Sequence, residues 1–266
     1  MLLNKLLKNF SSLLKEEWKL AIKNVLLPCY CIKCGERLIT EENVYYCPKC
    51  WANLTHTERP FCPICGIQHP VAVGFGTRSN FPCAECRKNP NKYIESIQSP
   101  LQYTDFTREA IIVFKFHKEK NLAKPFGEIL RNWIKEEMAD LEFDLIIPVP
   151  LHPYRLKRRG FNQSYLLAKE ILPCYPKAEL SQTLIRTKPT RSQSTLSTKE
   201  RKENIKNAFD VKEPASVRNK RILLMDDLVT TTSTVTECAK TLKKYQVHSV
   251  YVLSLARAHP KTVSQE

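Results

Sequence analysis

The sequence predicts an α/β protein in which a parallel-sheet domain follows a small cysteine-rich zinc-ribbon module. Two observations support this prediction. Nine of the eleven cysteines lie between Cys29 and Cys86, and from about residue 96 onward short apolar runs alternate with helical patterns. Strands alternating with helices imply a sheet of parallel strands. A short cysteine-rich segment lacks core area, so metal ligation replaces hydrophobic burial there.

The chain has 266 residues, enough for one medium domain and a smaller one. We expect an amphipathic N-terminal helix over 1–27, a double zinc ribbon over 28–95, the α/β domain over 96–260 and a tail over 261–266. A hydrophobic content of 42% with 9% aromatic residues excludes wholesale disorder. The net charge of +15 favours polyanionic partners such as nucleic acid, phosphorylated small molecules or an anionic membrane surface.

The N-terminal stretch is apolar at helical spacing, from Leu3 to Val25, but lysines and glutamates interrupt it. A signal peptide or a bilayer-spanning helix needs an unbroken apolar run, so neither is predicted. We interpret the stretch as a helix packed on its own protein, with a basic amphipathic helix on a membrane face or partner as the alternative. A cytoplasmic location is therefore expected.

Eight cysteines form four CxxC pairs: Cys31 and Cys34, Cys47 and Cys50, Cys62 and Cys65, Cys83 and Cys86. Because intracellular thiols stay reduced, such pairs predict tetrahedral zinc sites rather than disulfides or redox dithiols. Each site needs four thiolates, so two structural zinc ions are expected. Gly35 and Gly66 directly follow a pair, where a left-handed backbone turns amides toward the sulfurs. Consecutive and crossed pairings both remain open from the spacing.

Three apolar runs, 144–150, 221–227 and 249–255, are predicted as buried strands, with helices over 162–172 and 233–245. In parallel sheets, ligands bind beyond the carboxyl ends of the strands. The segments that follow Val149 and Asp227 are therefore expected on the same edge of the sheet. These two segments are therefore the candidate binding site.

The segment after the second strand combines an acidic doublet with a run of hydroxyl side chains: Asp226, Asp227, Thr230, Thr231, Thr232, Ser233 and Thr234. Hydroxyls and free amides at a helix N-terminus suit a phosphate. Ionised aspartates accept paired bonds from vicinal sugar hydroxyls. Together the two features indicate a phosphorylated ribose. The alternative is that the hydroxyls cap the helix and the aspartates belong to a turn.

The other segment on this edge is basic and surrounds Gly160: Arg155, Lys157, Arg158, Arg159, Asn162 and Gln163. Guanidinium and amide donors suit a pyrophosphate or a nucleic-acid backbone. The alternative is a solvated charged face. Its place at a strand end favours binding.

Three stretches carry a resemblance to a known family. They are IPVPLHPYRLKRRGFNQS, the spaced residues from Leu184 through Gln193, Arg201 and Asn204 to Phe209, and ILLMDDLVTTTST. The chain resembles the ComF-type competence proteins (ComF/GntX type) over nearly its whole length. This family combines zinc knuckles with a type I phosphoribosyltransferase-like parallel-sheet domain.

The resemblance implies that Asp226 and Asp227 hold the ribose hydroxyls of phosphoribosyl pyrophosphate, and that residues 230–234 cradle its 5′-phosphate. It places Arg155 and Arg159 near the pyrophosphate, with Mg²⁺ bridging. One departure matters, because the family usually has glycine where this chain has Thr232. If that position needs a positive φ, a β-branched residue is strained there, which affects turnover more than binding.

The resemblance also implies a role in DNA uptake during natural transformation, with single-stranded DNA and DNA-uptake proteins at the inner membrane face as partners. The residues expected to contact nucleic acid are Lys115, Arg158, Asn162, Gln163, Arg186, Arg191 and Arg201. The alternatives are an active phosphoribosyltransferase with an unidentified acceptor and a regulator that senses phosphoribosyl pyrophosphate. The sequence has no helix-turn-helix signature to favour the regulator.

Overall fold

The computed structural model describes residues 28–38, 45–70, 79–116, 119–188 and 205–259. The chain divides into two compact units, Met1–Asn53 and Leu54–Glu266. The predicted helix over 1–27 and tail over 261–266 lie outside the described residues. The division falls inside the cysteine-rich segment, so its first two CxxC pairs belong to one unit and its last two to the other.

The described part of the first unit, 28–38 and 45–53, contains little regular structure. Strand β1 (Cys29–Tyr30) pairs antiparallel with β2 (Arg37–Leu38), and one short helix, α2 (Pro48–Trp51), follows. Tyr46 is fully buried and stacks on Trp51, with ring centroids 5.8 Å apart. The described residues around these elements bury little apolar area, so the cysteines are needed to hold this part of the chain together.

The second unit is built on a six-stranded sheet in which every pairing is parallel, as the sequence predicted. The strand order is β3–β10–β9–β5–β6, and β4 pairs with the end of β10. The strands are β3 (Ile97–Gln98), β4 (Leu101–Gln102), β5 (Leu145–Pro148), β6 (Glu179–Leu180), β9 (Arg221–Val229) and β10 (Ser249–Arg257). Nearly continuous apolar runs form the central strands because both faces of the sheet are covered.

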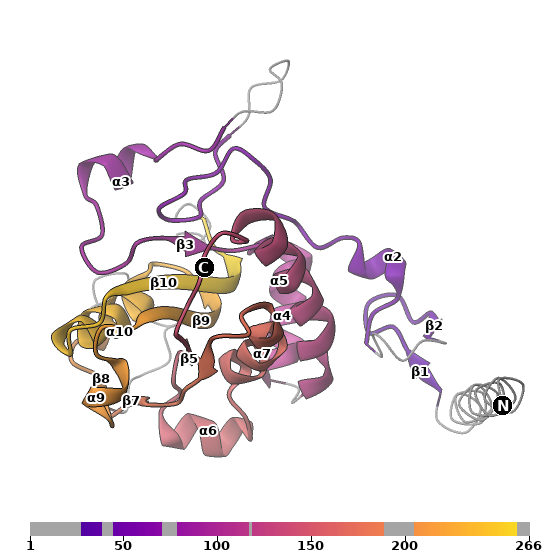
Figure 1. Ribbon diagram of the computed structural model, residues 1–266. Helices are drawn as coiled ribbons and strands as arrows, with labels where there is room; N and C mark the ends of the chain where they lie inside the picture. Colours follow the sequence, from indigo (N-terminus) through magenta and orange to yellow (C-terminus); the bar gives the residue numbers. More distant parts are fainter. Residues whose placement is uncertain (1–27, 39–44, 71–78, 117–118, 189–204, 260–266) are drawn as a thin grey trace, which may run out of the picture. The chain divides into compact units, whose positions relative to one another are not determined.

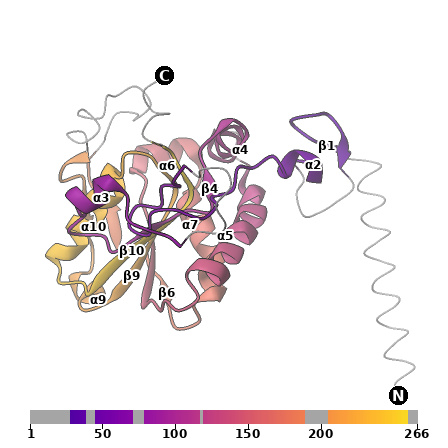
Figure 2. The same cartoon turned by 90° about the horizontal axis from the view of Figure 1, so that it is seen from above.

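Helices cover one face of this sheet (Figures 1 and 2). They are α4 (Asp105–Phe116), α5 (Ala123–Glu137) and α7 (Gln163–Ile171). The ring of Phe114 lies 5.6 Å from that of Phe126 and joins α4 to α5. It also lies 5.9 Å from the ring of Phe161, which is buried just ahead of α7.

The opposite face carries α10 (Ser233–Lys244), α9 (Pro214–Val217) and the antiparallel pair β7 (Leu184–Arg186) and β8 (Phe209–Val211). Val235, Cys238, Ala239 and Leu242 of α10 pack in one core cluster with Leu224 of β9. Cys238 is therefore a buried core residue.

Short elements complete this unit: α3 (Ala84–Lys88), η1 (Lys120–Leu122), α6 (Pro153–Arg159) and η2 (Leu172–Cys174). Helix α6 directly follows the end of β5 and stops at Gly160, whose φ is +84°. Asn162 then caps α7 by accepting a bond from the Ser164 amide at 3.0 Å. This cap starts α7 at the edge of the sheet where β9 also ends.

Candidate functional site

The eight cysteines of the CxxC pairs gather into two groups of four. One group is Cys31, Cys34, Cys47 and Cys50, and the other is Cys62, Cys65, Cys83 and Cys86. Within each group the sulfur atoms lie within 4.8 Å of one another. The pairing that the sequence left open is therefore consecutive.

The sulfur spacing fits zinc. A Zn–S bond of about 2.3 Å in a tetrahedron separates the sulfurs by roughly 3.8 Å. The Sγ atoms of Cys34 and Cys47 lie 3.7 Å apart, and those of Cys65 and Cys83 lie 3.8 Å apart. Four soft ligands without an open position define closed, structural sites. The two groups are thus structural zinc sites, the first in the Met1–Asn53 unit and the second in the unit with the sheet.

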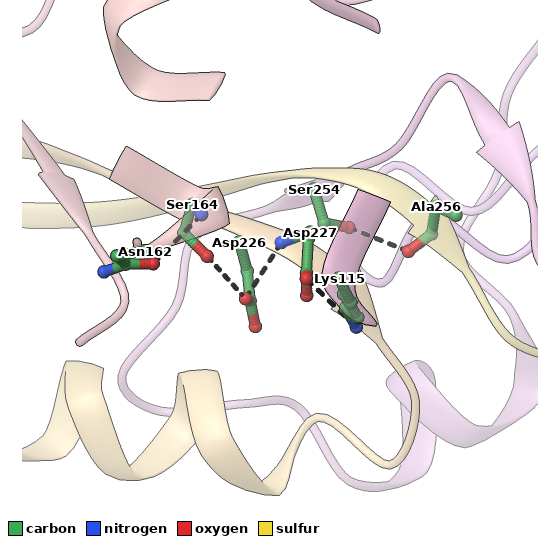
Figure 3. A network of polar contacts seen from close by, with 7 residues as sticks. All are labelled: Lys115, Asn162, Ser164, Asp226, Asp227, Ser254 and Ala256. Atoms are coloured by element: carbon green, nitrogen blue, oxygen red, sulfur yellow. Dashed lines mark hydrogen bonds and ion pairs between the residues drawn. The ribbon is translucent and has the colours of Figure 1, made fainter. Parts of the chain in front are cut away.

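The acidic doublet lies near the carboxyl end of β9. Asp226 is 8% exposed, and its Oδ1 accepts bonds from the Ser164 hydroxyl at 3.1 Å and the Asp227 amide at 2.9 Å (Figure 3). Burial, followed by the charge of Asp227, raises the pKa of Asp226 to about 7. Its carboxyl group therefore exchanges a proton near neutral pH, whereas an exposed aspartate stays ionised.

Asp227 is held by a different partner. Its Oδ2 lies 3.0 Å from the Nζ of Lys115, at the end of α4 (Figure 3). Both side chains are largely buried, with 5% of Asp227 and 16% of Lys115 exposed. Lys115 was expected to contact nucleic acid, and the structure instead places its ammonium group on the acidic doublet.

The hydroxyl-rich segment joins β9 to α10. Thr232 is the N-cap residue of α10 and has φ +61° and ψ −11°. The position where the family usually has glycine thus has a left-handed backbone, which strains a β-branched side chain. The hydroxyls of Thr231 and Ser233 lie 3.1 Å apart, and the Thr232 carbonyl accepts the Thr236 amide at 2.9 Å. The first amides of α10 follow this turn.

Two guanidinium groups of α6 lie beside the same edge of the sheet. Burial, and then the neighbouring Arg158, lower the pKa of Arg155. Burial also lowers the pKa of Arg159, and the charge of Asp227 opposes this shift. The Arg159 guanidinium lies 5.0 Å from the ring centroid of Phe116. Partly buried cations that repel one another favour an anion between them.

Arg186 belongs with this group rather than with the surface. It is 7% exposed on β7, with its guanidinium 5.4 Å from the centroid of the Phe209 ring. Burial, together with the charge of Arg155, lowers its pKa to about 10. From the sequence, Arg186 is expected to contact nucleic acid. Its burial makes a direct contact with a DNA backbone unfavourable.

The other residues that the sequence predicted for the binding site or for nucleic-acid contact lie partly in the interior and partly on the surface. Asn162 donates to the Val149 carbonyl at 3.1 Å and caps α7, and Gln163 is 4% exposed. Arg158 is exposed, whereas Arg191 and Arg201 lie outside the described residues. Thr230, Thr231, Thr232, Ser233 and Thr234 are partly exposed. The structure therefore brings together the acidic doublet, the hydroxyl-rich turn and the α6 arginines.

Two contacts were not foreseen from the sequence. Ser164 supports Asp226, although only its place in the FNQS motif hinted at a role. Arg257, at the end of β10, donates to backbone carbonyls around the start of the hydroxyl-rich turn. Nothing in the local sequence marks Arg257. Across the described ranges, no helix has the length and apolar character to cross a membrane.

Fold and site together define an α/β protein with a parallel sheet, two four-cysteine zinc sites and an acidic strand end beside a hydroxyl-rich turn. Residues 22–87 match the family model of the double zinc ribbon domain. This match spans both groups of cysteines, in agreement with the structure.

Relatives that match about four fifths of the chain identify the family. DNA utilization protein YhgH of Shigella flexneri is 32% identical over 214 residues, covering 79% of this chain and 89% of that protein. Competence protein F of Haemophilus influenzae is 30% identical over 233 residues, with 80% and 97% covered. Competence protein ComFC of Bacillus subtilis is 27% identical over 220 residues, with 80% and 84% covered. The chain belongs to this ComF family of competence and DNA utilization proteins.

Solved structures with a similar arrangement are more distant. A hypoxanthine phosphoribosyltransferase from Staphylococcus aureus has a TM-score of 0.34 and 14% identity, covering 52% of this chain and 74% of that one. The allosteric regulatory enzyme of purine biosynthesis has a TM-score of 0.33 and 16% identity, with 50% and 25% covered. The family assignment rests on the sequence relatives and not on these likenesses.

Proposed function

We propose that this protein acts in competence and DNA utilization by binding phosphoribosyl pyrophosphate at the end of β9 and single-stranded DNA on its basic surface. The family supports the general role, since its members are named for competence and DNA utilization. The carboxylates and the turn at the end of β9 support the small ligand. The net charge of +15 supports a polyanionic partner.

The small-ligand proposal rests on one observation, which is the order of the carboxylates, the hydroxyl-rich turn and the helix N-terminus along β9 and α10. Two aspartates lie near the end of a parallel strand, and a left-handed residue at Thr232 then turns the chain into a twelve-residue helix. The aspartates suit the two ribose hydroxyls, and the helix amides with Thr231 and Ser233 suit the 5′-phosphate. Spacing of this kind matches a phosphorylated pentose better than phosphate alone.

The diphosphate of the ligand requires cations. Arg155 and Arg159 lie on α6 beside the same edge, partly buried, and burial lowers the pKa of both guanidinium groups. Mg²⁺ would be carried by the diphosphate, whose oxygens are the hard ligands that this ion prefers. The donors of this chain that face such a ligand are oxygen and guanidinium groups, so they fit a magnesium diphosphate. Bound Mg²⁺ would neutralise charge on the leaving pyrophosphate in any transfer reaction.

The DNA proposal rests on exposed groups of α6. Tyr154 is 68% exposed, and Phe116, at the end of α4 with the Arg159 guanidinium of α6 over its ring, is 57% exposed. Lys157 and Arg158 are exposed on the same short helix. Aromatic rings next to cations are the pattern by which proteins bind single strands without reading their sequence. Phe161 is buried, so it does not belong to this surface.

Calorimetry with phosphoribosyl pyrophosphate and Mg²⁺ tests the small-ligand site. We expect the wild type to bind and the Asp226→Asn/Asp227→Asn variant to lose at least about tenfold in affinity, because bonds to charged acceptors contribute about 1.5–3 kcal/mol. Asp140→Asn, an exposed aspartate outside the site, is the matched control. Absence of binding by the folded wild type would refute the proposal. Release of pyrophosphate when bases, nucleotides or DNA are added distinguishes turnover from binding alone.

The pH dependence tests the role of Asp226 separately. Since its pKa is raised to about 7, the carboxyl is mostly ionised at pH 8 and mostly protonated at pH 6. An ionised carboxylate accepts both sugar hydroxyl bonds, so affinity for the ligand should fall about tenfold from pH 8 to pH 6. The Asp226→Asn variant should lack this component while keeping any change due to the ligand phosphates. Equal pH profiles would exclude Asp226 from the site.

Single-strand binding is tested by its salt dependence. Phosphate contacts release counterions, so the affinity for an oligothymidylate should fall steeply between 50 and 200 mM salt, with a slope of roughly −0.7 for each contact. Tyr154→Ala should weaken binding with little change in this slope, whereas Arg158→Gln should reduce the slope. A flat salt response of the wild type would contradict the proposal.

A further inference from the structure

Arg257 occupies a position between the second zinc site and the turn after β9. It is the last residue of β10, and it is 6% exposed. Among the described residues, its guanidinium forms no ion pair with a carboxylate, and it donates to four backbone carbonyls. These belong to Cys65, Val229, Thr230 and Ala258. A buried cation bound this way is fixed in direction because the guanidinium group is planar and its donors are rigid.

On one side, Arg257 contacts the zinc site. Its Nε donates to the carbonyl of Cys65 at 3.0 Å. Zinc bound by four thiolates carries a net formal charge of about −2. A buried guanidinium next to that charge is compensated by it, whereas the same group beside protonated thiols would be a buried charge with only carbonyl dipoles around it.

On the other side, Arg257 contacts the start of the turn. Its Nη1 donates to the Val229 carbonyl at 3.0 Å and also to the Thr230 carbonyl. The Val229 carbonyl accepts the Ala258 amide as well, at 2.9 Å. These bonds fix the backbone immediately before Thr232, the strained residue that starts α10. A second link runs from the same cysteine-rich segment to α10, where Asn91 Nδ2 donates to Thr236 Oγ1 at 3.0 Å.

We propose that Arg257 is a positioning residue that makes the conformation of the turn at residues 230–232 depend on zinc in the second site. With zinc bound, the Cys65 carbonyl and the zinc charge hold the guanidinium in place, and the guanidinium holds Val229 and Thr230. Without zinc, the guanidinium loses its fixed partner and the strained turn relaxes. The second zinc site is then a structural support for the turn, besides holding its own segment.

Amide hydrogen exchange on the full-length zinc protein tests this, without any ligand. The reporters are the Thr236 and Ala258 amides, which donate to the carbonyls of Thr232 and Val229. Arg257→Lys keeps the positive charge beside the zinc site but cannot donate to carbonyls on both sides. We expect both reporters to exchange about tenfold faster in this variant, because bonds from a charged donor are lost. The zinc content should stay at the wild-type level.

Metal removal provides the matched comparison. In Cys83→Ser/Cys86→Ser, which removes the second site, the two amides should exchange as fast as in Arg257→Lys or faster. In Cys31→Ser/Cys34→Ser, which removes only the first site, they should exchange as in the wild type. If the cysteine variant of the second site does not fold, Arg257→Lys decides alone. Wild-type exchange at both reporters in Arg257→Lys would overturn the proposal, as would equal loosening by loss of the first site.

The consequence for ligand binding rests on the proposed function and is measured separately. Phosphoribosyl pyrophosphate with Mg²⁺ should bind Arg257→Lys at least about fivefold more weakly than the wild type, since the turn is no longer preorganised. If exchange changes as expected but the wild type does not bind phosphoribosyl pyrophosphate, the proposed function fails and the role of Arg257 stands. If the wild type binds and exchange is unchanged, the role of Arg257 fails and the proposed function stands.

Discussion

The two zinc sites have almost the same local geometry and very different surroundings. In each, a glycine after the first CxxC pair has a left-handed backbone, with φ +73° at Gly35 and +71° at Gly66. Each glycine amide donates to the carbonyl of the first cysteine, Cys31 or Cys62, at 2.8 Å. The knuckle is thus a local structure, set by a few residues and the metal.

What differs is the structure around each knuckle. Around the first site, the described residues of its unit form two short strands and one turn of helix. The second lies in the same unit as the sheet: the Ile64 carbonyl accepts the Ile97 amide of β3 at 2.9 Å, and Phe61 packs 5.3 Å from the ring of Trp133 in α5. The same metal motif can therefore stabilise a small module by itself or form part of the core of a larger one.

The largest effect is expected when one zinc-binding cysteine is removed from each site in turn. Cys86→Ser should lower the free energy of unfolding of the sheet unit by more than about 4 kcal/mol, because loss of a structural metal is among the most destabilising single changes. Cys50→Ser should abolish zinc binding at the first site and leave the unfolding of the sheet unit unchanged. Urea unfolding followed by circular dichroism measures both. Equal destabilisation by the two variants would contradict the distinction.

A second test keeps all ligands and changes only the knuckle glycines. A Cβ at Gly66 would lie 2.6 Å from the Ile97 carbonyl oxygen, whereas a Cβ at Gly35 would have no atom of the described residues within 4 Å beyond its chain neighbours. Both substitutions carry the left-handed penalty of about 1–2 kcal/mol. Gly66→Ala should therefore cost about 3 kcal/mol or more, because backbone must also move, and Gly35→Ala only about 1 kcal/mol in its own unit. Thermal unfolding of each zinc-loaded variant measures these losses of stability. Similar losses in the two variants would mean that the structure around the knuckle does not matter.

Much of this arrangement could be predicted from the sequence because it depends on local patterns. CxxC spacing indicated both metal sites, and apolar runs alternating with helical patterns indicated a parallel sheet. The strand at Asp144–Pro150 is observed as β5, Leu145–Pro148, and the helix over 233–245 as α10, Ser233–Lys244. The division between the second and first zinc sites was not foreseen, since it depends on contacts of Phe61 and Ile64 with residues far along the chain.

The sequence predicted which residues follow β9 in the candidate site better than it predicted what these residues contact. The acidic doublet and the hydroxyl-rich turn follow one strand, so their proximity is a consequence of chain order. Lys115 and Arg186 look like ordinary surface cations in the sequence, yet tertiary packing buries both. Their partners lie about a hundred residues away or on another strand, and no local pattern records such distances.

A third test extends the comparison of backbone strain from the knuckles to the turn after β9. The knuckles have glycine at positive φ, whereas the turn has Thr232 at φ +61°. Thr232→Gly should raise the free energy of unfolding by about 1 kcal/mol, since relief of strain exceeds the entropy that glycine adds to the unfolded chain. Thr231→Gly, one residue earlier and outside the positive-φ positions, should be destabilising instead. Equal shifts in the urea midpoint of the two variants would exclude strain at Thr232.

The smallest expected effect concerns a surface link between the second zinc segment and α5. Arg59 donates through Nε and Nη2 to the two carboxylate oxygens of Glu137, both at 2.8 Å. Its side chain is 53% exposed, so water and salt screen the pair. Arg59→Met should therefore cost only about 0.5 kcal/mol, and less at high salt. Lys177→Met, whose pair with Glu142 is more exposed on both sides, serves as the control with no measurable cost. A loss from Arg59→Met as large as that from Gly66→Ala would mean that ion pairs, rather than backbone contacts and packing, attach the second zinc segment to the sheet.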